Sequence, residues 1–162
     1  PGTEFCTLAV TNSQGAARDL LRFRPETPEK AALFQSISIH LSGCPNSCAK
    51  HQVADIGLAG TMTPVGDLRR FSYQLFLGGQ VEGGIRLGAM VRKGITEERV
   101  VPTVDALIGI VATHRLQGES FQETVLRLGT EPVASLLEKE IGPLTHELSE
   151  AITMIPDLIE VQ

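Results

Sequence analysis

The sequence contains no tryptophan and one tyrosine, and aromatic residues make up only 4% of the chain. Proteins that bind single-stranded nucleic acid use aromatic side chains as platforms for base stacking. Proteins that bind a duplex need a basic face, whereas this chain has a formal net charge of −5. No apolar run approaches the roughly 18 residues of a membrane-spanning helix, and no secretory signal opens the chain. We therefore expect neither a nucleic-acid partner nor a membrane association.

Cysteine is also scarce, with three residues at positions 6, 44 and 48. An odd number of cysteines is a poor basis for a disulfide framework. Free thiols persist in a reducing compartment, so we predict a cytoplasmic protein. The length of 162 residues and the 42% hydrophobic content are ordinary for a globular chain that buries one core.

Hydrophobic periodicity predicts an α+β fold in which helices cover a small, mostly antiparallel sheet. Tyr73, Leu75 and Leu77 alternate with polar neighbours, which is typical of a strand with one buried face. The apolar spacing after Thr96 is instead typical of the longest helix. We expect strands at 36–41, 54–61 and 71–77, and helices at 13–23, 101–117, 121–128, 131–141 and 145–155.

The candidate metal-binding residues are concentrated in the segment 42–50, which contains Cys44 and Cys48. Gly43 permits a tight turn after an apolar strand, and Pro45 is tolerated where a helix begins. A helix here would place the two sulfurs on one face, four residues apart. The positive end of its dipole would favour the thiolate of Cys48, which is the form that binds metal.

The residues alone leave the kind of metal site open. His40 and His51 flank the two cysteines, so a zinc site is chemically conceivable. The sequence has no second pair of closely spaced cysteines, however, which zinc sites usually combine with the first. An iron–sulfur cluster requires thiolates, normally four. A non-catalytic α+β module with structural or zinc-binding cysteines is therefore the alternative to a redox protein.

The run Ser42-Gly43-Cys44-Pro45-Asn46-Ser47-Cys48, followed by Val53-Ala54-Asp55-Ile56-Gly57-Leu58, resembles the second cysteine motif of the sirohaem and [4Fe–4S] nitrite and sulfite reductases. That family holds its cluster with a C-x5-C pair and a C-x3-C pair, and the last cysteine also bridges to the sirohaem iron. The resemblance implies that Cys6, Cys44 and Cys48 are cluster ligands, that Cys48 is the bridging one, and that Asn46 contributes to cofactor binding. The first cysteine of the family would precede Pro1.

The resemblance extends through Gly118-Glu119-Ser120-Phe121 and implies a truncated sirohaem and [4Fe–4S] domain over residues 1–128, the C-terminal half of a haem domain. Residues 129–162 would form a helical extension. The implied activity is the six-electron reduction of nitrite to ammonia or of sulfite to sulfide, with electrons from ferredoxin or a similar donor. Residues 5–9 favour the nitrite branch; a precorrin substrate is a third possibility, because precorrin-3B synthases share the cofactor. We expect the fragment, without the N-terminal half of the enzyme, to contain no cofactor and to be inactive.

Glycines at positions 78, 79, 83 and 84 allow two interpretations. They could form a flexible connection, or they could let the backbone approach the flat sirohaem closely. Arg86, Arg92 and Lys93 follow, and such side chains either pair with cofactor carboxylates or are simply solvated.

Overall fold

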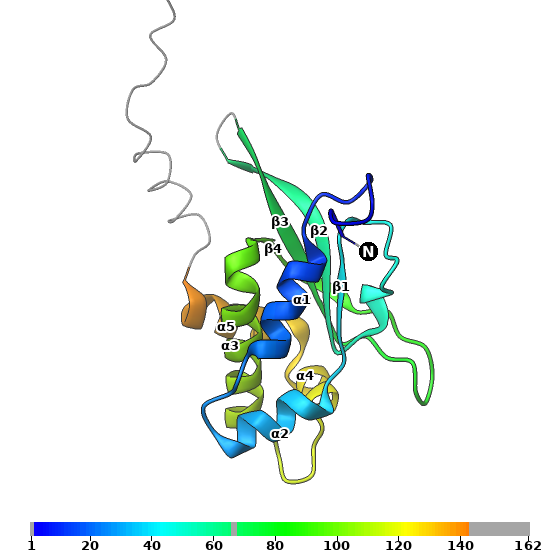
Figure 1. Cartoon of the computed structure of the whole chain (residues 1–162). Helices are drawn as coiled ribbons and strands as arrows, with labels where there is room; N and C mark the ends of the chain where they lie inside the picture. Colours follow the sequence, from blue (N-terminus) through cyan, green and yellow to red (C-terminus); the bar gives the residue numbers. More distant parts are fainter. Residues whose placement is uncertain (1, 66–67, 143–162) are drawn as a thin grey trace, which may run out of the picture.

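A computed structural model describes residues 2–65 and 68–142 of the protein. Within them a sheet packs against α-helices (Figure 1). The strands are β1 (Ile39–Ser42), β2 (Ile56–Val65), β3 (Leu68–Leu77) and β4 (Ala89–Ile95). The α-helices are α1 (Ser13–Arg22), α2 (Pro28–Ser36), α3 (Val100–His114), α4 (Phe121–Leu128) and α5 (Thr130–Ile141), and two 3-10 helices are η1 (His51–Val53) and η2 (Glu97–Arg99).

The four strands are arranged in sequence order, β1-β2-β3-β4. β2 and β3 form a long antiparallel hairpin, and β4 continues the antiparallel pattern. β1 alone runs parallel to its neighbour, with Ile39 opposite Ile56. The α+β class and the mostly antiparallel sheet are thus confirmed.

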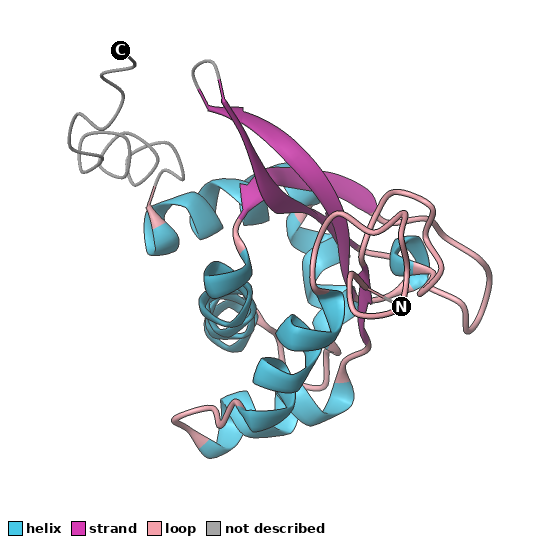
Figure 2. Ribbon diagram, turned by 45° about the horizontal axis from the view of Figure 1, so that its top comes forward, coloured by secondary structure: helices cyan, strands magenta, loops and turns pink. Residues whose placement is uncertain are grey.

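Helices gather on one side of the strands, and long loops lie toward the other (Figure 2). The side chains of Leu58, Tyr73 and Leu75 are fully buried in the strands, and Val104 and Leu107 are fully buried in α3. These residues belong to one hydrophobic core. α5, which begins the segment that we expected to be an extension, adds the fully buried Val133 and Leu137 to the same core.

Several predicted boundaries were wrong. β1 begins at Ile39 rather than at residue 36, and α3 ends at His114 rather than at residue 117. β2 continues to Val65 rather than ending at residue 61, and Thr63 and Pro64 pair with β3. The helix expected at 145–155 lies outside the described residues.

Two elements were missed, α2 and β4. No element was expected between residues 23 and 36, yet Thr27 caps a helix there by accepting from the Lys30 N–H (3.3 Å). Proline at the first helical position fixes the correct φ and loses no hydrogen bond there. β4 contains Arg92 and Lys93, and its pairing with β3 has register shifts, so it shows no simple alternation.

No helix among residues 2–65 and 68–142 is long and apolar enough to cross a membrane.

Candidate functional site: two adjoining cysteine loops

The turn after β1 does not start an α-helix, which corrects the prediction for Cys48. Ser47 and Lys50 have positive φ angles of 58° and 53°, and left-handed residues interrupt a right-handed helix. A β-turn-like bond from the Lys50 N–H to the Ser47 carbonyl (2.7 Å) follows instead, ahead of the short η1. The helix-dipole argument for a Cys48 thiolate therefore does not apply.

Ser42 and His51 close this turn at its base. The Oγ of Ser42 accepts from the Ala49 N–H (3.3 Å) and lies 3.1 Å from Nδ1 of His51. Both side chains are buried, and the imidazole packs against the ring of Phe76 with centroids 4.8 Å apart. Burial lowers the pKa of His51, because it disfavours the charged imidazolium.

Glycines let neighbouring segments approach the backbone that follows the cysteines. A Cβ on Gly79 would lie 2.6 Å from the Ala54 carbonyl oxygen and 2.7 Å from the Val53 carbonyl carbon. Gly88 donates its N–H to the Gln52 carbonyl (2.6 Å). The close approach at Gly79 is therefore to the chain's own backbone, which neither interpretation of the glycines had anticipated.

The loop that carries Cys6 packs directly on the turn that carries Cys44. The Gly43 carbonyl accepts from the backbone N–H groups of Val10 (2.8 Å) and Thr11 (3.1 Å). A Cβ on Gly43 would lie 3.1 Å from the Cβ of Ala9, so only glycine allows this contact without a shift. In Figure 1 the dark blue N-terminal loop lies beside the cyan segment that follows β1.

The three cysteines differ in accessibility. Cys44 is buried, Cys6 is half-buried and Cys48 is exposed, and none forms a disulfide. Asn46 is also exposed. The structure brings the two cysteine loops into contact, but residues 2–65 and 68–142 contain no group of three or more His, Cys, Asp or Glu side chains positioned around one metal.

The histidines near the turn have other contacts. Nδ1 of His40 lies 3.2 Å from the Lys50 carbonyl oxygen, and Nδ1 of His51 lies beside Ser42. These contacts involve only the Nδ1 atoms of the two rings, and neither histidine belongs to a group of three or more His, Cys, Asp or Glu side chains around one metal within residues 2–65 and 68–142.

The segment 118–121 has a structural role at the start of α4. The Glu119 carboxylate accepts from the Arg127 guanidinium (2.6 and 2.7 Å) and from the Leu116 N–H (2.9 Å). The Arg127 hydrogen bond, followed by the backbone one, lowers the pKa of Glu119 to about 2. Ser120 and Glu123 then form a capping box that begins α4. The Ser-x-x-Glu spacing is the sequence signature of such a capping box.

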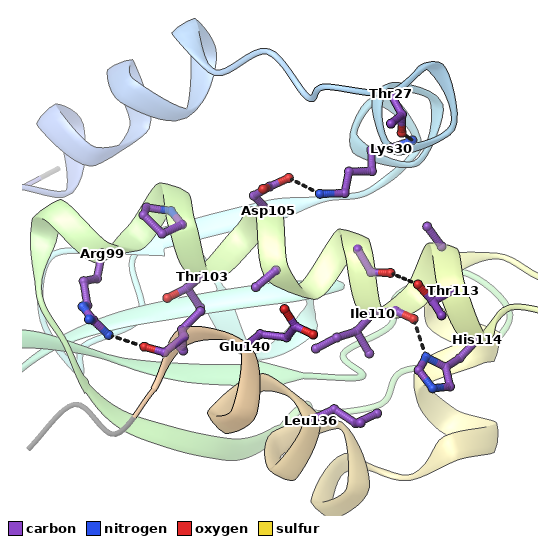
Figure 3. A pocket seen from close by; sticks show the side chains of 15 residues that line it. Thr27, Lys30, Arg99, Thr103, Asp105, Ile110, Thr113, His114, Leu136 and Glu140 are labelled. Carbon is purple, nitrogen blue, oxygen red and sulfur yellow. Dashed lines mark hydrogen bonds and ion pairs between the residues drawn. The ribbon is translucent and has the colours of Figure 1, made fainter.

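A separate groove of about 760 Å³ lies between α2, α3 and α5 (Figure 3). Lys30 on α2 pairs with Asp105 on α3 at 3.0 Å, and Arg99 donates to the Ile141 carbonyl (2.8 Å). No residue of the two cysteine loops lines this groove. The groove is thus distinct from the cysteine site, and no pattern in the sequence predicted it.

Comparison with known proteins gives a consistent result. Residues 1–143 match the family described as the nitrite and sulphite reductase 4Fe-4S domain. The ferredoxin–nitrite reductase of Leptolyngbya laminosa is 36% identical over 107 residues, which cover 66% of this chain and 20% of that protein. The NADPH sulfite reductase hemoprotein beta-component of Serratia proteamaculans is 39% identical over 132 residues, which cover 76% of this chain and 20% of that protein.

The solved structure of the Mycobacterium tuberculosis NirA protein superposes with a TM-score of 0.67 at 29% identity. The match covers 82% of this chain and 25% of the NirA chain. The present chain thus spans about 20% of the length of the two curated relatives.

Proposed function

Because the chain belongs to the nitrite and sulphite reductase 4Fe-4S domain family, we propose that its two cysteine loops form part of the site that holds a [4Fe–4S] cluster and sirohaem in such a reductase. The observation that carries this proposal is the contact at Gly43, whose carbonyl accepts from both Val10 and Thr11. That contact makes the loops of Cys6 and Cys44 a single unit.

The residues present fit thiolate ligation. Cys6, Cys44 and Cys48 would hold the cluster, and Asn46 lies exposed between the last two. Cys48, as the exposed cysteine of the three, would be the cluster ligand that is also available to sirohaem. When bound, the cluster and sirohaem supply electron transfer to the substrate. The polypeptide fixes the thiols: Gly43 joins the loops, and the Ser42–His51 base sets where the turn begins and ends.

In the whole reductase we assign this site to the six-electron reduction of nitrite or sulfite. The names of the relatives support that class: one is a ferredoxin–nitrite reductase and another an NADPH sulfite reductase component. Ferredoxin or a similar small donor would deliver the electrons. The 162-residue polypeptide by itself offers three thiols, whereas a [4Fe–4S] cluster normally takes four. We therefore expect this polypeptide alone to purify without the cluster or sirohaem and to reduce neither substrate.

The test is iron and acid-labile sulfide analysis under anaerobic conditions. It compares the 162-residue polypeptide with a full-length reductase that contains it, together with dye-linked nitrite and sulfite reduction. In the full-length protein, Cys6→Ser, Cys44→Ser and Cys48→Ser should each lower iron and sulfide, while Ser135→Ala on the exposed side of α5 should not. Full iron and sulfide content in all three cysteine variants would refute the assignment. Stoichiometric zinc in place of iron would favour the non-catalytic module.

A further inference from the structure

Ser42 and His51 mark the two ends of the turn that carries Cys44 and Cys48. Ser42 is the last residue of β1, and His51 is the first residue of η1. Nδ1 of His51 lies 3.1 Å from the Ser42 Oγ, and this contact is buried. This buried side-chain hydrogen bond thus spans the base of the turn, beside the exposed contact between Nδ1 of His40 and the Lys50 carbonyl (3.2 Å).

Both ends of this hydrogen bond are anchored to the sheet. Ser42 pairs with Ala59 of β2 in the parallel register. The imidazole of His51 rests on Phe76 of β3, and the His51 carbonyl fits against Gly57 of β2. Because β2 and β3 are the central strands, the hydrogen bond transmits the rigidity of the sheet to the turn.

We propose that the Ser42–His51 hydrogen bond holds the two ends of the cysteine turn together. His51 is then a positioning residue for Cys44 and Cys48 rather than a metal ligand. Its meaning for the reductase rests on the proposed cluster function. The hydrogen bond itself belongs to the polypeptide and can be tested without any cofactor.

The chemistry of the pair defines informative substitutions. A serine hydroxyl has one proton and two lone pairs, and the Ala49 N–H uses one lone pair. The hydroxyl proton and the second lone pair remain, so the Ser42 Oγ can either donate to Nδ1 of His51 or accept from it. Asparagine at position 51 keeps a polar atom near the place of Nδ1 but loses the ring contact with Phe76. Leucine keeps apolar volume against Phe76 but offers no hydrogen bond.

The experiment measures site-resolved alkylation of the three thiols by iodoacetamide in the 162-residue polypeptide, read by mass spectrometry. Cys44 is buried and reports opening of the turn, whereas the exposed Cys48 and the half-buried Cys6 serve as internal references. A hydrogen bond contributes about 0.5–1.5 kcal/mol, so its loss should raise the Cys44 rate about two- to twelvefold. We expect that increase in His51→Leu and Ser42→Ala and a near wild-type rate in His51→Asn.

Two comparisons separate positioning from simple packing. If His51 only filled space, His51→Asn would expose Cys44 more than His51→Leu does, and that order would overturn the proposal. An unchanged Cys44 rate in both Ser42→Ala and His51→Leu would overturn it as well. Ser42→Ala also removes the acceptor of the Ala49 N–H, so the double variant should match Ser42→Ala rather than the sum of the two single variants. Ser42→Ala preserves the ring packing and keeps the test valid if His51→Leu does not fold.

The outcome is separable from that of the proposed function. If the thiol rates follow the expected order while the full-length protein binds no iron, the positioning role of the Ser42–His51 hydrogen bond is correct and the cluster assignment is wrong. If the full-length protein binds iron normally while the thiol rates of the variants are unchanged, the cluster assignment is correct and the positioning role of the Ser42–His51 hydrogen bond is wrong.

Discussion

The carbonyl oxygen of His51 lies 2.0 Å from the place where a Cβ atom on Gly57 would stand. Gly57→Ala must therefore push the backbone of η1 off the sheet. We expect a loss of about 1–3 kcal/mol in the free energy of unfolding, the usual cost of overpacking. Urea unfolding of the variant measures it.

Gly109→Ala is the matched control for Gly57→Ala. Gly109 lies within α3, and its nearest neighbour is the flexible end of the Lys30 side chain, 3.3 Å from an added Cβ. Alanine favours a helix interior over glycine, so we expect this variant to gain about 0.5–1 kcal/mol. Equal destabilisation of both variants would contradict the account of Gly57.

Tyr73 gives a spectroscopic prediction at alkaline pH. Burial raises the pKa of Tyr73 to about 12. The unfolded chain ionises its tyrosine near pH 10, so between these values the unfolded state has lost a proton that the folded state keeps. Stability should therefore fall as pH rises, by roughly 2–3 kcal/mol across the interval.

The measurement for Tyr73 is direct because it is the one tyrosine and there is no tryptophan. Near-ultraviolet absorbance should show tyrosinate only at strongly alkaline pH in the folded protein. Tyr73→Phe should flatten the stability profile in this interval. Ionisation of the folded protein near pH 10 would contradict the predicted burial.

His51 gives a prediction at mildly acidic pH. Its folded pKa lies below the ordinary 6.5, so below that pH the unfolded state binds the proton more readily. Stability should then decrease as pH falls through 6.5, and His51→Asn should remove this contribution. The difference between the urea midpoints of the two proteins, followed across that pH, isolates His51 from the carboxylates that titrate in both. A difference that does not vary with pH would count against a buried, neutral imidazole.

Ser120→Ala should remove the capping box of α4. The Ser120 Oγ accepts from the Glu123 N–H at 3.2 Å, and the Glu123 carboxylate accepts from the Ser120 N–H at 2.8 Å. Loss of such a cap costs about 0.5–2 kcal/mol. Ser135→Ala, on the exposed side of α5, should change the free energy of unfolding much less, and thermal unfolding compares the two.

The sequence was most informative where a pattern repeats or a motif is specific. Alternation at Tyr73, Leu75 and Leu77 located β3, and the cysteine motif indicated the family that the comparisons show. β4 escaped prediction because Arg92 and Lys93 break the alternation. The Arg92 guanidinium donates to the Gly142 carbonyl (3.0 Å), a contact that depends on a segment 50 positions away.

The arrangement of the site was less predictable than its residues. Pro45 favoured a helix locally, but the turn is set by Ser47 and Lys50 in left-handed geometry and by contacts with the N-terminal loop. The clash between a Gly57 side chain and His51 is equally invisible in the sequence, because it requires β2 and η1 to be in place. Such contacts arise only after distant segments have packed.

The parallel pairing of β1 with β2 has a consequence for the length of the cysteine segment. Parallel neighbours in a sheet need a connection of about a dozen residues or more, and residues 43–55 provide little beyond that minimum. The connection therefore has almost no slack. Shortening it by two residues should break the pairing of β1, whereas an insertion near Gly84, which has no neighbour within 4 Å of an added Cβ, should be tolerated. The number of residues between Cys48 and β2 is therefore constrained by the strand pairing of the sheet as well as by the cysteine site.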